Sequence, residues 1–205
     1  MPSDSKLHVI PSADLQRFAS ALFAAAGVAP PMADEWAKSL VWANLRGVDS
    51  HGVLRIPGYI ERLKTQAINP APDMRVEQRS GAIAVLEADR APGAVAMAKA
   101  MDEAIARARE VHVGLCAARN ITHAGAVGYF ALQAANAGMA GIVMSLSGPM
   151  MAYHGQPPDT VGHTRTQNPC IVPMPSAYLA RCPAVSRTRA DTPRQAILLL
   201  QDRSE

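Results

Sequence analysis

The chain has 205 residues, of which 49% are hydrophobic and 18% charged, so it can build one large globular domain or two small ones. Its net charge of +3 comes without any run of Lys or Arg, which gives no support to nucleic-acid binding. Three cysteines without C-x-x-C spacing argue against a disulfide scaffold, and the sequence predicts neither a signal peptide nor a membrane-spanning run. We therefore expect a cytoplasmic protein that binds neither nucleic acid nor membrane.

The first seventy residues predict helices separated by proline and glycine. One helix is expected from Ser12, as its N-cap, to Gly27, and a second begins at Pro31. A third is expected over residues 57–66, followed by a stiff linker at 69–72. Helical spacing assigns four apolar side chains of the first helix to the core: Leu15, Phe18, Leu22 and Phe23.

Beyond the linker, short apolar runs alternate with helical patterns. Strands are expected at 82–87, 111–117 and 140–145, with helices from 92 to 108 and from 124 to 137. The strand at 111–117 contains no Asp, Glu, Lys or Arg, so we expect both of its faces to be buried. This alternation predicts an α/β layer with parallel strand pairing.

The densest group of polar side chains lies in residues 44–55, between the second and third helices. Between and around two glycines it contains Arg46, Asp49, Ser50, His51 and Arg55. If the next helix begins here, His51 and Arg55 share one face, because they are four residues apart. An imidazole can exchange a proton with a carbonyl or alcohol oxygen, and a guanidinium can hold a carboxylate. The alternative is a structural corner in which Asp49 pairs with Arg46 or Arg55.

A second polar segment, residues 119–129, follows the strand at 111–117. Loops at the carboxyl ends of strands bind ligands in α/β proteins, and small residues let a ligand approach the backbone. The spacing of Gly125 and Gly128 is not a G-x-G-x-x-G fingerprint, so the alternative is helix packing with His123 as a cap. The histidines lack metal-ligand spacing, and no metal site is expected.

Together, these two segments resemble the type-2 malate/L-lactate dehydrogenase family. The resemblance rests on the strings Leu45–Pro57 and Asn120–Tyr129 and extends over residues 10–155. It implies a helical N-terminal unit followed by an incomplete, family-specific, non-Rossmann α/β sheet that binds NAD or NADP. The implied reaction is hydride transfer between NAD(P)H and a small 2-oxo or 2-hydroxy acid, in a protein that forms a homodimer.

The resemblance also implies roles for individual residues. His51 would be the acid/base at the substrate carbonyl, and His123 would be a second catalytic histidine. Ser50 and Arg55 would bind the substrate, with Arg55 on its carboxylate, and Ser147 would contact the cofactor. A protonated imidazole would stabilise the negative charge that hydride transfer leaves on the oxygen.

The composition changes again after residue 155. We expect a helical domain at 1–72, a partial cofactor-binding domain at 73–155, and a tail at 156–205 that is disordered or read out of frame. Within the tail, Asn168 lies in an imperfect copy of the family's Gly-Thr-Asn-Pro cofactor turn. Such a chain is either a dehydrogenase or an inactive truncated remnant that acts at most as a dimerisation partner.

Overall fold

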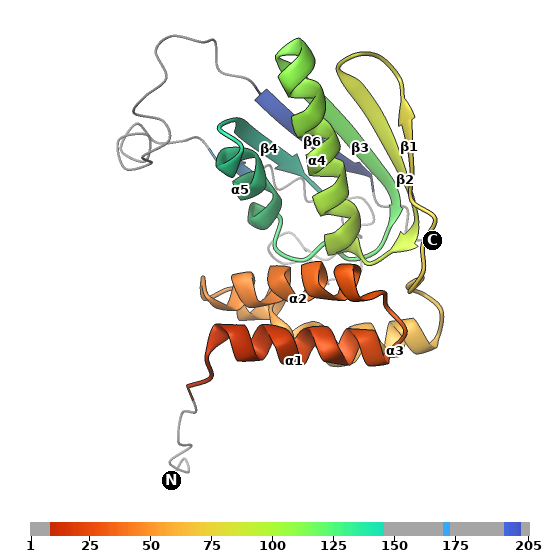
Figure 1. Cartoon of the computed structure of the whole chain (residues 1–205), viewed down its shortest axis with the longest axis vertical. Helices are drawn as coiled ribbons and strands as arrows, with labels where there is room; N and C mark the ends of the chain where they lie inside the picture. Colours follow the sequence, from red (N-terminus) through yellow and green to blue (C-terminus); the bar gives the residue numbers. More distant parts are fainter. Residues whose placement is uncertain (1–8, 146–169, 173–194, 202–205) are drawn as a thin grey trace, which may run out of the picture.

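A computed structural model describes residues 9–145, 170–172 and 195–201 of the chain, which form a helical layer beside a mixed sheet (Figure 1). The α-helices are α1 (Ser12–Ala25), α2 (Pro30–Asn44), α3 (Ile56–Lys64), α4 (Gly93–Val111) and α5 (Gly128–Asn136). The strands are β1 (Arg75–Gln78), β2 (Ile83–Ala91), β3 (Val113–Ile121), β4 (Ala140–Met144), β5 (Cys170–Val172) and β6 (Gln195–Gln201). The predicted α/β class and the helical N-terminal unit are confirmed.

The helical unit is organised around an aromatic cluster. The rings of Phe23 and Trp36 stack with centroids 4.0 Å apart, and Tyr59 lies 4.9 Å from Trp36. Aromatic pairs of this kind contribute about 0.5–1.5 kcal/mol beyond their buried area. Two predictions for α1 are wrong: Phe18 is 62% exposed, and the N-cap is Pro11 rather than Ser12. The helix begins one residue earlier than predicted, because the carbonyl oxygen of Pro11 accepts hydrogen bonds from the N–H groups of Asp14 and Leu15.

The sheet has the strand order β1-β2-β3-β6-β4-β5. Strands β2, β3, β6 and β4 run parallel to one another, whereas the outer strands β1 and β5 pair antiparallel with β2 and β4. The sequence analysis did not predict β1, β5 or β6. Strands β5 and β6 fall in the segment after residue 155, which the sequence analysis describes as disordered or read out of frame. The run Ala196–Leu200 of β6 is apolar, which is typical of a strand between two neighbours.

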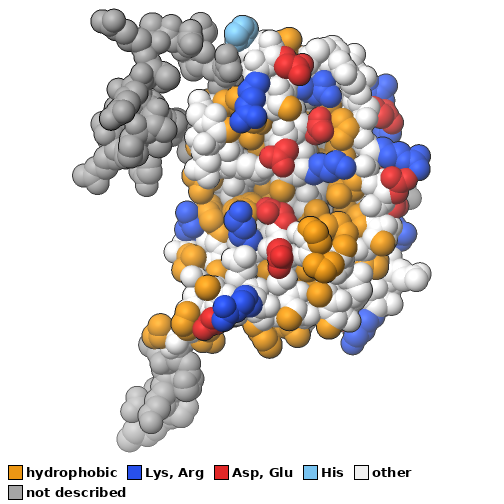
Figure 2. Space-filling model, in the orientation of Figure 1, with side chains coloured by type: hydrophobic (Ala, Val, Ile, Leu, Met, Phe, Trp, Pro, Cys, Tyr) orange, Lys and Arg blue, Asp and Glu red, His pale blue; other side chains and the backbone are white. Residues whose placement is uncertain are grey.

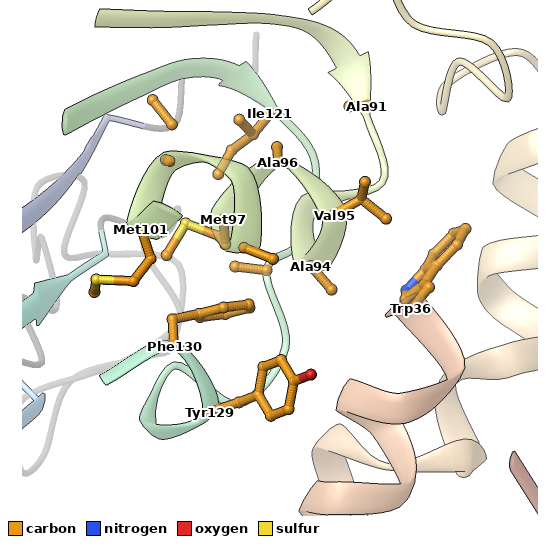
Figure 3. Packing of buried hydrophobic residues seen from close by; sticks show 14 of the residues in the cluster. Trp36, Ala91, Ala94, Val95, Ala96, Met97, Met101, Ile121, Tyr129 and Phe130 are labelled. Atoms are coloured by element: carbon orange, nitrogen blue, oxygen red, sulfur yellow. The ribbon is translucent and has the colours of Figure 1, made fainter. Parts of the chain in front are cut away.

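Helix α4 packs closely against the sheet because small residues line the contact. A Cβ atom at Gly114 of β3 would lie 1.8 Å from the carbonyl oxygen of Ala104, so only glycine fits there. Alanines and two methionines, Met97 and Met101, fill the space between α4 and its neighbours, and Phe130 of α5 covers them (Figure 3). The core therefore needs few aromatic side chains, as the composition indicates.

Strand β3 corrects the expectation of a strand buried on both faces. Residues Gly114, Cys116 and Ala118 are buried under α4, whereas Val113, Leu115 and Ala117 on the other face retain solvent exposure. Burial raises the pKa of the Cys116 thiol to about 12, so this cysteine stays protonated.

The surface of the described residues carries charges of both signs. Acidic and basic side chains are interspersed over the face shown in Figure 2, without an extended patch of one sign on that face. Within residues 9–145, 170–172 and 195–201, no helix is long and apolar enough to cross a membrane.

Candidate active site

The segment between α2 and α3 is held together by Asn44, the last residue of α2. Its Oδ1 accepts a hydrogen bond from the backbone N–H of Val53 over 2.9 Å, and its Nδ2 donates to Asp49. A Cβ at Gly52 would lie 2.2 Å from Asn44 Oδ1, which explains the glycine. The ion pair proposed for Asp49 with Arg46 or Arg55 is wrong, because the amide of Asn44 takes its place.

Two short 3₁₀ turns replace the single helical face expected for His51 and Arg55. Residues Asp49–His51 and Val53–Arg55 form separate turns, divided by an extended Gly52. The two side chains are nevertheless linked through Ser50. Arg55 Nε donates to the carbonyl oxygen of Ser50 over 2.6 Å, and Ser50 Oγ lies 3.0 Å from His51 Nδ1.

His123 lies in the loop that leaves the carboxyl end of β3. Helix α5 begins at Gly128, four residues later than predicted, and its N-cap is Val127 without a side-chain cap. The alternative that His123 caps this helix is therefore wrong. Gly125, within the loop, has a φ of +81°, and the loop turns there before the helix begins.

The fold brings both predicted catalytic histidines together with a tyrosine. The rings of His51 and His123 are stacked with centroids 5.6 Å apart. Tyr59 of α3 places its hydroxyl 2.7 Å from His123 Nδ1. These three side chains come from a 3₁₀ turn, a loop after β3 and a helix, and we call them the His51–Tyr59–His123 cluster. Ser50 and Arg55 lie at its edge through the contacts described above.

Burial and positive charge lower the pKa of both histidines. For His51, partial burial acts first and the charge of Arg55 second. For His123, burial, Arg55, His51 and Arg62 lower the pKa to about 4. Burial raises the pKa of Tyr59 to about 12. Both shifts favour the neutral form of the imidazole over the protonated form.

The sequence analysis did not name Tyr59 as a site residue. Two facts could have pointed to it. Tyr59 comes just after the string Leu45–Pro57, eight residues after His51, and a buried tyrosine hydroxyl needs a hydrogen-bond partner. The predicted cofactor residues Ser147 and Asn168 lie outside the described residues.

A separate cleft of about 420 Å³ lies between α2, α4 and α5. Its lining includes Glu35, Lys38, Lys99, Asp102, Tyr129 and Gln133. The hydroxyl of Tyr129 donates to Glu35 over 2.8 Å, and Gln133 donates to Asp102 over 2.5 Å. Several of its polar groups are thus paired with one another, and neither His51 nor His123 contributes to it. Among the described residues, no group of three or more His, Cys, Asp or Glu could hold a metal ion.

The chain is similar to known dehydrogenases in sequence and in structure. The chain is 37% identical over 146 residues to a malate dehydrogenase of Pyrococcus abyssi, covering 71% of this chain and 40% of that protein. It is 40% identical over 119 residues to the ureidoglycolate dehydrogenase (NAD(+)) of Escherichia coli K12, covering 58% and 34%. The solved malate dehydrogenase of Pyrococcus horikoshii OT3 superposes with a TM-score of 0.71 at 36% identity, covering 74% and 44%. The chain thus spans less than half the length of these relatives.

The family model described as malate/L-lactate dehydrogenase matches residues 10–183. This match extends past residue 155, where the sequence analysis placed the end of the resemblance, so that boundary is corrected. It includes both strings and all three residues of the His51–Tyr59–His123 cluster. The chain belongs to the malate/L-lactate dehydrogenase family.

Proposed function

We propose that this protein is an oxidoreductase that transfers a hydride between NAD(P)H and a small 2-oxo or 2-hydroxy acid. The observation that carries the proposal is the meeting of His51, His123 and Tyr59 beside Arg55, at the carboxyl end of β3. Family membership supports the reaction class, and the relatives named above act on different small acids. An imidazole that can transfer a proton, next to a guanidinium that can hold a carboxylate, supports an acid of this kind as the substrate.

Arg55 is the group that would hold the substrate carboxylate. Its Nε is engaged by the carbonyl oxygen of Ser50, which fixes the guanidinium and leaves its two terminal nitrogens for a bidentate contact. A carboxylate bound there neutralises the positive charge that lowers the pKa of His51 and His123. Substrate binding would therefore raise the pKa of both histidines toward the pH at which they exchange protons.

Tyr59 would set the tautomer of His123. A neutral phenol is a better donor than an imidazole N–H, and the pKa of about 12 keeps Tyr59 protonated. When its hydroxyl donates to Nδ1, the proton of neutral His123 resides on Nε2. His123 then presents an N–H donor toward the site, where it can stabilise negative charge that develops on the substrate oxygen.

The loop beside this cluster supports the proposal of a nicotinamide cofactor. The loop 122–127 leaves the end of a parallel strand. Among the described residues, no heavy atom beyond its chain neighbours lies within 4 Å of a Cβ added at Gly125, so a planar ring could approach the backbone there. The nicotinamide, when bound, supplies or accepts the hydride. We include Ser147 and Asn168 in the proposed cofactor site, and we leave NAD and NADP as equal candidates.

The test is a titration of the purified chain with NADH and NADPH, read by nicotinamide fluorescence, followed by pyruvate or oxaloacetate. We expect saturable binding, and oxidation of the cofactor when the 2-oxo acid is added. His51→Asn and His123→Asn should lower turnover by about 100-fold or more, as loss of acid–base catalysis does. The matched control is His112→Asn, an exposed histidine at the end of α4 whose left-handed φ of +70° asparagine tolerates.

A second candidate is a remnant without turnover that binds another copy or a longer relative as a dimer. The coverage of 34–44% of the relatives' length favours testing it. Sedimentation velocity of the chain alone and mixed with a full-length relative separates the two candidates. A folded dimer that binds neither nicotinamide cofactor would establish the remnant and overturn the dehydrogenase.

A further inference from the structure

Three residues in the left-handed region, none of them glycine, meet at the carboxyl ends of β2 and β3. Asp89, Arg90 and Asn120 have φ values of 50°, 56° and 55°. A side chain with a Cβ rarely adopts this conformation, and asparagine tolerates it better than arginine does. Such backbone persists where the surrounding contacts hold it in place.

These residues form a bulge between the two parallel strands. Glu87 of β2 lies opposite Arg119 of β3, but the next aligned pair is Ala91 with Ile121. Three residues of β2, numbers 88–90, therefore face one residue of β3, Asn120. We call residues 88–90 the β2 bulge.

The carboxylate of Glu87, just before the β2 bulge, closes the bulge by hydrogen bonds to the neighbouring strand β3. Its Oε2 accepts a hydrogen bond from Arg119 Nε over 2.7 Å, and its Oε1 accepts one from Asn120 Nδ2 over 3.0 Å. Partial burial raises the pKa of Glu87, but the hydrogen bonds from Asn120 and Arg119 outweigh it and lower the pKa overall. Glu87 is therefore a carboxylate that contacts the left-handed residue of the opposite strand.

The β2 bulge also holds the segment that follows α3. Asp89 Oδ2 accepts from Asn69 Nδ2 over 2.7 Å and from the backbone N–H of Asp73 over 3.1 Å. The carbonyl oxygen of Arg90 accepts a hydrogen bond from the N–H of Asn69, and the guanidinium of Arg90 donates one to the carbonyl oxygen of Gln66. The helix that carries Tyr59 ends only two residues before Gln66. The β2 bulge thus fixes the end of that helix to the sheet.

The residues just after the β2 bulge fix the backbone of His123. Thr122 Oγ1 donates to the carbonyl of Ala91 over 2.9 Å and accepts from the N–H of Gly93 over 3.0 Å. A Cβ at Gly93 would lie 2.4 Å from the carbonyl oxygen of His123, so helix α4 begins directly against this backbone. His123 is therefore held by residues 91–93, which follow the bulge directly.

We infer that the β2 bulge, closed by Glu87, sets the separation of Tyr59 and His123, and that Glu87 is a positioning residue of the site. The segment after α3 is fastened to the bulge itself, and the segment before His123 is fastened to residues 91–93 directly after it. The effect of Glu87 on turnover rests on the proposed function, whereas its effect on the placement of His123 does not.

The test is the titration of His123 in the full chain by histidine NMR, in Glu87→Ala and in the matched control Glu77→Ala. Glu77 also contacts Arg119, at 3.4 Å, but makes no contact with Asn120. In Glu87→Ala we expect the pKa of His123 to rise by about one unit or more toward 6.5, because the ring loses its buried position. Glu77→Ala should leave it unchanged. A folded Glu87→Ala protein in which the pKa of His123 is unchanged overturns the inference.

Two variants of Asn120 test the backbone directly. Asn120→Gly keeps the left-handed turn without strain, so it should keep His123 near its original pKa even without the Glu87 contact. Asn120→Val, which is β-branched, should displace His123. The reverse pattern overturns the inference. Because the titration needs neither cofactor nor substrate, a protein without turnover still gives a result, and a negative result leaves the proposed function standing.

Discussion

The hydroxyl of Tyr59 lies 2.7 Å from Nδ1 of His123, although 64 residues separate them in the chain. The contact joins the helical unit to the sheet at the centre of the candidate site. It connects a tyrosine that stays protonated with a histidine that stays neutral, because burial moves the pKa of each against its charged form.

Replacing Tyr59 by phenylalanine should raise the pKa of His123. The hydroxyl stabilises the neutral imidazole, since a protonated Nδ1 cannot accept its hydrogen bond. A bond of this kind contributes about 1 kcal/mol, which corresponds to somewhat less than one pKa unit. Histidine NMR over pH 3–8 measures the change, and an unchanged or lower pKa in Tyr59→Phe would show that the hydroxyl does not act as donor.

Acidification should destabilise the chain between pH 6.5 and pH 4. In this window the unfolded His123 binds a proton, whereas the folded one stays neutral down to about pH 4. The contribution of His123 to stability is therefore fully present above pH 6.5. This contribution falls by at most about 3.5 kcal/mol as the pH decreases, because a difference of one pKa unit between the folded and unfolded states corresponds to about 1.4 kcal/mol. Urea denaturation at several pH values measures this slope. His123→Gln should flatten it, and an equal slope in that variant would contradict the assignment.

The Asn44–Gly52 contact predicts a specific pair of effects. Gly52→Ala should destabilise the fold by about 1–3 kcal/mol, because the new Cβ collides with the Asn44 amide. Asn44→Ala should itself cost about 1 kcal/mol or more, since the Val53 N–H loses its acceptor. In the Asn44→Ala background, adding Gly52→Ala should cost less than it does alone. Thermal unfolding of the four proteins checks this, and strictly additive losses would refute the contact.

Close packing of α4 on β3 predicts that Gly114→Ala is strongly destabilising, by about 3 kcal/mol or more, because its Cβ would meet backbone atoms of α4. Gly58→Ala is the matched control. Gly58 lies in α3, and in the described part of the chain no heavy atom outside its own helix backbone and chain neighbours lies within 4 Å of an added Cβ. Alanine there should therefore stabilise by about 0.5–1 kcal/mol. Chemical denaturation distinguishes the two, and equal stabilities would mean that α4 does not approach β3 this closely.

The local sequence determined much of this protein. Apolar periodicity, proline and glycine placed α1 to α5 and the strands β2 to β4, because these signals depend on neighbouring residues. The two strings at 45–57 and 120–129 identified the family and named His51, His123, Ser50 and Arg55 as candidates. Strand ends were less well predicted: β2 and β3 both run four residues further than expected, through Ala91 and Ile121.

The tertiary structure decided how these parts meet. No local pattern shows that Asp49 pairs with Asn44, that Tyr59 reaches His123, or that β6 pairs with both β3 and β4. Each of these depends on segments distant in sequence or on a backbone conformation that local propensity disfavours. The low pKa of His123 is likewise a property of the assembled site, because it arises from burial and from charges that the fold brings close.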